Sequence, residues 1–157
     1  MTDVTALYEK HAPSVFRFAL YLSGDRALAE DLTSETFVRV WASAVPVRMA
    51  TVKGYLFTIT RNLYLQGVRE QARHVVLEDN LPDSGASPYE QAAAKDEFSR
   101  VRNSLMQLPE IDRTALLMRA FDEMPYEEIA HVLGISLASV KVKIHRARVA
   151  LGRSRGQ

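Results

Sequence analysis

The stretch Tyr126–Leu151, YEEIAHVLGISLASVKVKIHRARVAL, decides the fold of the C-terminal half. Its first part predicts a helix with one apolar side, and Gly134 then breaks that pattern, as expected where the backbone needs a positive φ. Ser136 is a suitable N-cap for a second helix. One face of that second helix is apolar: Val140, Ile144, Ala147 and Leu151. Two helices joined by such a short turn predict a helix-turn-helix.

The other face of the second helix carries small, apolar and basic side chains. Ser139, Val142 and Arg146 lie roughly opposite the apolar face, and Lys141, Lys143 and Arg148 flank them. Lys and Arg neutralise phosphates, and an outward apolar residue such as Val142 can meet a thymine methyl group. A solvated basic face also fits these charges. The spacing of Ala130, Gly134 and Val140 favours a DNA-binding helix in the major groove.

Composition excludes several classes of protein. The 157 residues have a hydrophobic content of 47%, enough for one domain or two small ones. The absence of Cys excludes disulfides and thiolate metal sites, and the four His do not cluster, so no cofactor is expected. The sequence has no paired carboxylates, nucleophile–base arrangement or phosphate-binding Gly loop, so we expect no enzyme. Because no signal peptide or long apolar run is evident, we expect a cytoplasmic protein.

Two helices are predicted before the first loop. The first spans about Thr5–Leu22, and Pro13 is either interior or within the first turn of a helix that starts near His11. The second spans about Arg26–Ser43, with Asp25 as its N-cap. Four residues of the second helix are expected to face a core: Leu28, Leu32, Val40 and Trp41.

A third helix is predicted over about Val52–Arg73, after a loop at about Ala44–Thr51. It interleaves basic residues with aromatic ones, which suits single-stranded nucleic acid: bases stack on rings and phosphates pair with cations. Equally well, the aromatic residues could be core and the cations solvated. Gly67 is expected to mark a kink or an early end.

The residues that follow read as a linker. The segment from about Val75 to Ser87 is acidic and contains Pro, Gly and Ser with little periodicity. The sequence therefore predicts an all-α fold with two small helical domains, residues 1–74 and 89–157, joined by a flexible linker, residues 75–88.

Three stretches together resemble the extracytoplasmic-function group (group 4) of the sigma-70 family. AEDLTSETFVRVW is similar to that family's region 2.2, and VKGYLFTITRNLYLQGVRE to its regions 2.3 and 2.4. LPEIDRTALLMRAFDEMPYEEIAHVLGISLASVKVKIHRARVAL resembles region 4. The resemblance covers nearly the whole chain, in the order and with the linker position that the family has.

The resemblance implies a sigma factor that directs core RNA polymerase to −35/−10 promoters and helps to open the −10 element. Four residues of the second helix would bind the β′ clamp helices: Asp31, Leu32, Glu35 and Thr36. The loop at Ala44–Thr51 and Asn62 would hold a flipped base, while Arg61, Arg69 and Arg73 would hold the DNA backbone. The helix-turn-helix, with the six residues named above, would read the −35 element.

The implied partners are core RNA polymerase, through its β′ clamp helices and β flap, and promoter DNA as duplex and as the non-template single strand. An anti-sigma factor is a further expected partner and could hold the protein at the inner membrane. No small-molecule substrate and no membrane insertion are expected. The chain departs from the family pattern at Ser34, Gln66, Gly67, Val142 and Lys143, which bears on the exact promoter.

Two other interpretations stay open from the sequence. A dimeric helix-turn-helix repressor would explain the C-terminal half but gives the basic–aromatic helix no role. A sigma-like decoy that binds an anti-sigma factor would keep the fold without needing the basic recognition helix. Accessible Arg61 and Asn62 would favour a sigma factor, and their burial in a dimer interface would favour the repressor.

Overall fold

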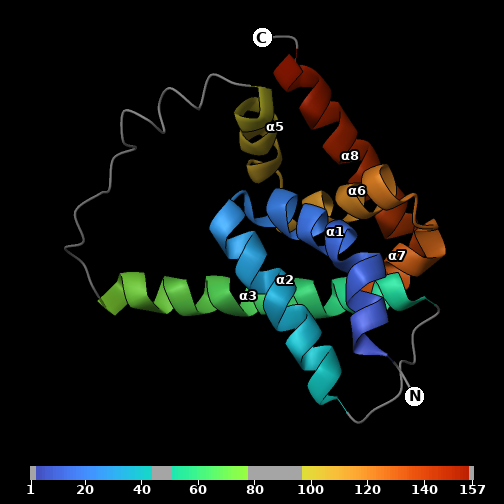
Figure 1. The fold of residues 1–157 in the computed structure, drawn as a ribbon. Coiled ribbons are helices and arrows are strands. Elements are labelled where there is room, and N and C mark those ends of the chain that lie inside the picture. The colour runs from blue at the N-terminus through green and yellow to red at the C-terminus, as the bar shows by residue number, and fades with distance from the viewer. Residues whose placement is uncertain (1–2, 44–50, 78–96, 156–157) are drawn as a thin grey trace.

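The computed structural model describes residues 3–43, 51–77 and 97–155. Within these ranges the chain forms helices and no strands, which confirms the all-α fold class (Figure 1). The helices are α1 (Val4–Ser23), α2 (Arg26–Ala42), α3 (Val52–Leu77), α5 (Glu97–Met106), α6 (Glu110–Asp122), α7 (Tyr126–Leu133) and α8 (Leu137–Arg155). We call α1–α3 the N-terminal half and α5–α8 the C-terminal half. The loop predicted before Thr51 lies mostly outside the described residues, as do residues 78–88 of the predicted linker.

Helix α1 is continuous through Pro13, so the alternative start near His11 is wrong. The helix is capped by Asp3, whose carboxylate accepts hydrogen bonds from the backbone N–H groups of Thr5 and Ala6. A proline inside a helix removes one backbone hydrogen bond. Burial of one face after Pro13, which includes Val15 and Phe18, offsets that loss, and Leu7 before it is partly buried against the same core.

Helix α2 begins after Asp25, whose carboxylate accepts from the N–H of Leu28, so the predicted N-cap is confirmed. Leu32 and Val40 are buried as expected. Trp41, however, is 76% exposed and Leu28 is also exposed, so their predicted places in the core are wrong. Successive helical residues point about 100° apart, and the face that packs inward includes Ala29 and Phe37 instead.

Helix α3 continues four residues beyond its predicted end at Arg73, into the first residues of the predicted linker. Gly67 does not end it. No other side chain lies within 4 Å of a Cβ placed at Gly67, which shows that this part of α3 is not packed against a neighbour. In Figure 1 the C-terminal half of α3 extends beyond α1 and α2, and α2 crosses the helix near its middle.

The helix-turn-helix is confirmed as α7 and α8. Gly134 has φ 67° and ends α7, as its place in the sequence predicted. The Ser136 hydroxyl accepts a hydrogen bond from the N–H of Ser139 at 3.0 Å, which caps α8. Val140, Ile144 and Ala147 are buried and hold α8 against α6 and α7.

The two halves pack against each other and share one hydrophobic core. Helix α1 contacts α5 and α6, and α3 contacts α7. The division into two domains remains a prediction. Contact between the halves buries part of the surface of each. None of the described helices combines the length and apolar character that a bilayer crossing requires.

Candidate nucleic-acid and partner interfaces

The outward face of α2 carries two acids one turn apart. Asp31 and Glu35 are exposed, and Glu35 accepts a hydrogen bond from Nε of Arg39 at 3.2 Å. Both acids line a shallow groove of about 280 Å³ between α2 and α3. Exposed carboxylates at this spacing can receive bidentate Arg groups from a partner.

The other two residues predicted on this face lie inside the molecule. Leu32 and Thr36 are buried. The Thr36 hydroxyl donates to the carbonyl of Leu32 at 2.7 Å and lies 2.8 Å from the hydroxyl of Thr60 on α3. In this arrangement Thr36 joins α2 to α3, and Asp31 and Glu35 are the members of the set that a partner can reach.

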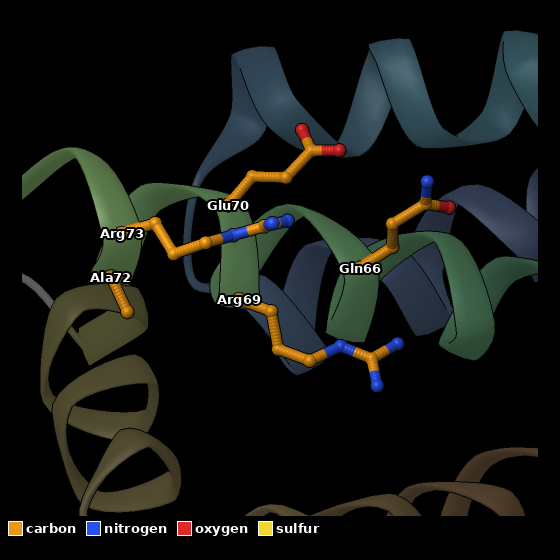
Figure 2. Close-up of a pocket in the computed structure, with 5 residues that line it drawn as sticks. All are labelled: Gln66, Arg69, Glu70, Ala72 and Arg73. Atoms are coloured by element: carbon orange, nitrogen blue, oxygen red, sulfur yellow. The ribbon is translucent and has the colours of Figure 1, made fainter.

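The C-terminal half of α3 presents Arg69 and Arg73 beside a second pocket, of about 660 Å³ (Figure 2). Gln66 and Glu70 line it from the same helix. All four side chains are exposed. The place is open enough for an extended strand, and the two guanidinium groups can pair with phosphates.

Arg61 and Asn62, about two turns before Arg69 on α3, have different environments. Asn62 is exposed, so its amide can both donate to and accept from a base edge. The Arg61 side chain is only 15% exposed, because its Nε lies 2.7 Å from Oε1 of Glu110 on α6. This cover comes from the same chain. It is therefore not the dimer interface that the repressor interpretation anticipated.

Helix α8 offers a face that fits a major groove. Lys141 and Arg148 are exposed, as is Val142, with 59% of its surface accessible. Ser139 and Lys143 are partly exposed beside them. Val142 thus lies opposite the buried face of α8, with Ser139 and Lys143 on one flank and Lys141 and Arg148 on the other.

Arg146 differs from its neighbours on α8. Its guanidinium makes two hydrogen bonds to Asp112 of α6, from Nε at 2.8 Å and from Nη2 at 2.9 Å. These bonds raise the pKa of Arg146 above its ordinary value. Because the Asp112 side chain is completely buried, Arg146 is the cation that balances it. The pair fixes the recognition helix on its support.

We expect Arg146→Ala to lower the urea midpoint of unfolding, whereas Arg148→Ala leaves it unchanged. Loss of Arg146 leaves the buried Asp112 carboxylate unpaired, which is costly, while Arg148 is exposed on the same helix. Chemical denaturation followed by circular dichroism measures both midpoints. Equal midpoints for the two variants would show that Arg146 does not hold α8 in place.

Sequence reasoning missed the residues that join the two halves. Glu110 and Asp122 of α6 contact Arg17, Lys53 and Arg61 of the N-terminal half. The partners are between 49 and 105 residues apart in the chain, so no local pattern pairs them. In the sequence, these residues look like ordinary charged residues of solvent-exposed helix faces.

Curated relatives with similar sequences are RNA polymerase sigma factors of the extracytoplasmic-function group. SigE of Mycolicibacterium smegmatis is 35% identical over 151 residues, which cover 92% of this chain and 58% of the relative. SigM of Bacillus subtilis is 31% identical over 153 residues, covering 94% of this chain and 92% of the relative. The chain therefore spans little more than half of SigE but nearly all of SigM.

Family models match both halves. The model of sigma-70 region 2 matches residues 7–74, and that of sigma-70 region 4 matches residues 98–151. The chain belongs to the extracytoplasmic-function group of the sigma-70 family. In this sigma-70 family chain, α2 and all but the last turn of α3 lie within region 2, and α7 and most of α8 lie within region 4.

Solved structures agree on the fold. The sigma factor RpoE of Bartonella quintana, in complex with the anti-sigma factor NepR, matches with a TM-score of 0.82 at 24% identity, over 99% of this chain and 98% of that one. CnrH in complex with the cytosolic domain of CnrY matches with a TM-score of 0.68 at 25% identity, over 96% and 85%. The sigma-70 fold thus includes both halves of this chain.

Proposed function

We propose that this chain is an RNA polymerase sigma factor that directs core polymerase to −35/−10 promoters and helps to open the −10 element. The observation that carries the proposal is the match to region 2 and region 4, in that order, on a chain whose α3 and α8 each expose a cationic face. A duplex-binding helix and a single-strand-binding helix on one chain suit promoter recognition followed by strand separation.

Core polymerase would bind the α2 face. Asp31 and Glu35 are exposed and can pair with Arg residues of the β′ clamp helices. Leu32 and Thr36 lie beneath them and would contribute by holding α2 in place against α3. The β flap would contact the C-terminal half.

The −10 element would lie along α3. Asn62 would read a flipped base of the non-template strand through its amide, and Arg69 and Arg73 would pair with the strand's phosphates. Arg61 would join them once it is released from Glu110. The predicted base pocket at Ala44–Thr51 lies mostly outside the described residues.

The −35 element would receive α8 in its major groove. Lys141, Lys143 and Arg148 would neutralise phosphates, while Ser139 and Val142 approach base edges. Arg146 would act through Asp112 by setting the angle of α8. The sigma factor would supply recognition and strand separation, and the polymerase would make the phosphodiester bonds.

An anti-sigma factor is a further proposed partner. CnrH, which shares the fold at 25% identity, was solved with the cytosolic domain of CnrY. We place the protein in the cytoplasm, where core polymerase is found.

Run-off transcription tests the proposed function. Core polymerase would transcribe fragments of the host genome with and without this protein. Specific transcripts that require the protein support a sigma factor. If there are no transcripts but the protein alone binds duplex tightly, it is a repressor. An absence of both transcripts and DNA binding would favour the decoy.

We expect Lys141→Ala/Lys143→Ala to weaken promoter binding and to make the slope of log K against log salt less negative by about 2, because each lysine neutralises about one phosphate. Filter binding of the holoenzyme at several salt concentrations measures the slope. Arg100→Ala, which removes an exposed cation from α5, is the matched control and should keep the wild-type slope. An unchanged slope in the double variant would remove these lysines from the DNA interface.

A further inference from the structure

Arg61 of region 2, which is proposed to bind DNA, is paired with Glu110 of region 4. Both guanidinium nitrogens of Arg61 that face α6 are engaged: Nε with Oε1 of Glu110 at 2.7 Å and Nη2 with Oε2 at 3.0 Å. The hydroxyl of Thr114 donates to the same carboxylate at 2.9 Å and holds it in place. A bidentate, partly buried carboxylate presents to arginine the oxygens that a phosphate would otherwise present.

Asp122, at the other end of α6, makes a second contact of the same kind. Its side chain is 2% exposed and lies 3.4 Å from Nη2 of Arg17 and 3.2 Å from Nζ of Lys53. We call Arg17, Lys53, Arg61, Glu110 and Asp122 the charged interface. All three cations belong to the N-terminal half and both carboxylates belong to one helix of region 4.

The first turn of α3 is also covered by region 4. The Thr51 hydroxyl, just before α3, donates to the Glu128 carboxylate of α7. A Cβ placed at Gly54 would lie 3.5 Å from Cγ2 of Val132, which is an ordinary van der Waals contact. Region 4 therefore closes over region 2 from the start of α3 to Arg61.

This closed arrangement cannot bind a whole promoter. The −35 and −10 elements are about 25 base pairs apart, which is about 85 Å of duplex at about 3.4 Å per base pair. A compact chain of this length has a radius of gyration of about 15 Å. Helices α3 and α8 can reach both elements only after the two halves separate.

We propose that the closed arrangement is autoinhibitory, and that Glu110 and Asp122 of region 4 are intramolecular substitutes for DNA phosphates on the cations of region 2. The inference rests on the proposed function. Separation of the halves exposes Arg61, and the phosphates of the −10 strand then replace Glu110. Closure and DNA binding compete for the same cations, so each opposes the other.

A reversible covalent lock tests the closure. The chain has no Cys, so Gly54→Cys/Val132→Cys can form only one disulfide within a molecule. A Cβ at Gly54 would lie 3.5 Å from Val132 Cγ2, which is one bond from Val132 Cβ, so two cysteines here are near the Cβ–Cβ separation of about 3.5–4.5 Å found in disulfides. The Glu128 carboxylate, 2.7 Å from the new Cβ, ends a flexible side chain and can move aside.

We expect the oxidised lock to form in the free protein and to lower run-off transcription by about tenfold or more, with full recovery after reduction. Wild-type protein treated with the same oxidant is the control. Failure of the two cysteines to join in the free protein would overturn the closed arrangement. Full transcription by the oxidised form would overturn autoinhibition. If the wild-type and reduced proteins are also silent, the proposed function itself has failed.

Weakening the charged interface tests the proposal in the other direction. Glu110→Gln/Asp122→Asn removes two charges from the interface, and Glu97→Gln/Glu127→Gln removes two exposed charges from the same half. We expect the first variant to bind a single-stranded −10 oligonucleotide about threefold or more tightly than wild type, and more tightly than the control variant. Fluorescence anisotropy measures both affinities. Equal gains in the two variants would reduce the effect to net charge and overturn the specific role of Glu110 and Asp122.

Discussion

Replacing Arg113 with methionine is expected to lower the free energy of unfolding by about 2–4 kcal/mol. Arg113 is 4% exposed and lies where α6 meets the end of α1 and the middle of α3. Its Nε donates to the carbonyl of Leu22 at 2.9 Å, Nη1 to that of Leu108 at 3.0 Å, and Nη2 to the hydroxyl of Tyr64 at 3.2 Å. Methionine fills much of the volume but leaves these buried acceptors unpaired.

Urea unfolding followed by circular dichroism measures this loss. Arg113→Lys keeps the charge but can reach fewer of the three acceptors, so its stability should lie between those of Arg113→Met and wild type. Arg100→Met, on the exposed face of α5, should unfold at the wild-type midpoint. If Arg113→Met also unfolds at the wild-type midpoint, the hydrogen bonds of Arg113 to the N-terminal half do not stabilise the fold.

Asp31→Ala/Glu35→Ala is expected to weaken binding to core polymerase by about tenfold or more and to reduce specific transcripts accordingly. The two carboxylates are exposed on one face of α2. Within the described residues, the only ion pair that involves either of them is the exposed pair Glu35–Arg39. Their loss should therefore change affinity without changing the urea midpoint.

Competition against fluorescently labelled wild-type protein for core polymerase measures the affinity. Glu9→Ala/Glu30→Ala removes two other exposed acids from the same half and is the matched control. If Asp31→Ala/Glu35→Ala competes for core polymerase as well as unlabelled wild-type protein does, the polymerase-binding surface lies elsewhere. Equal losses in both variants would assign the effect to overall charge.

The helices and their caps could be predicted from the sequence because their causes are local. Asp25, Gly134 and Ser136 each act within one turn of the chain, and the structure places each as predicted. The buried face of α8 followed from its spacing for the same reason. The class of protein followed from three motifs in the right order.

The parts that could not be predicted depend on partners far away in the chain. Arg61 and Arg146 both carry charge at positions suited to DNA, yet each is paired with a carboxylate of α6, 49 and 34 residues away. The exposure of Trp41 has a different cause, which is local: its large apolar side chain suggests core, but it follows the buried Val40 and points about 100° away from it, towards solvent. Only the tertiary packing of the helices shows that Arg61 and Arg146 are paired.

Reactivity of thymines with permanganate at a promoter found by run-off transcription tests the central claim most directly. A sigma factor needs core polymerase to separate the strands, so the account predicts reactive −10 thymines only when this protein and core polymerase are both present. Asp31→Ala/Glu35→Ala should leave those thymines unreactive at the same concentration. Protection of duplex by the protein alone, with unreactive −10 thymines in the presence of core polymerase, would contradict the account and identify a repressor.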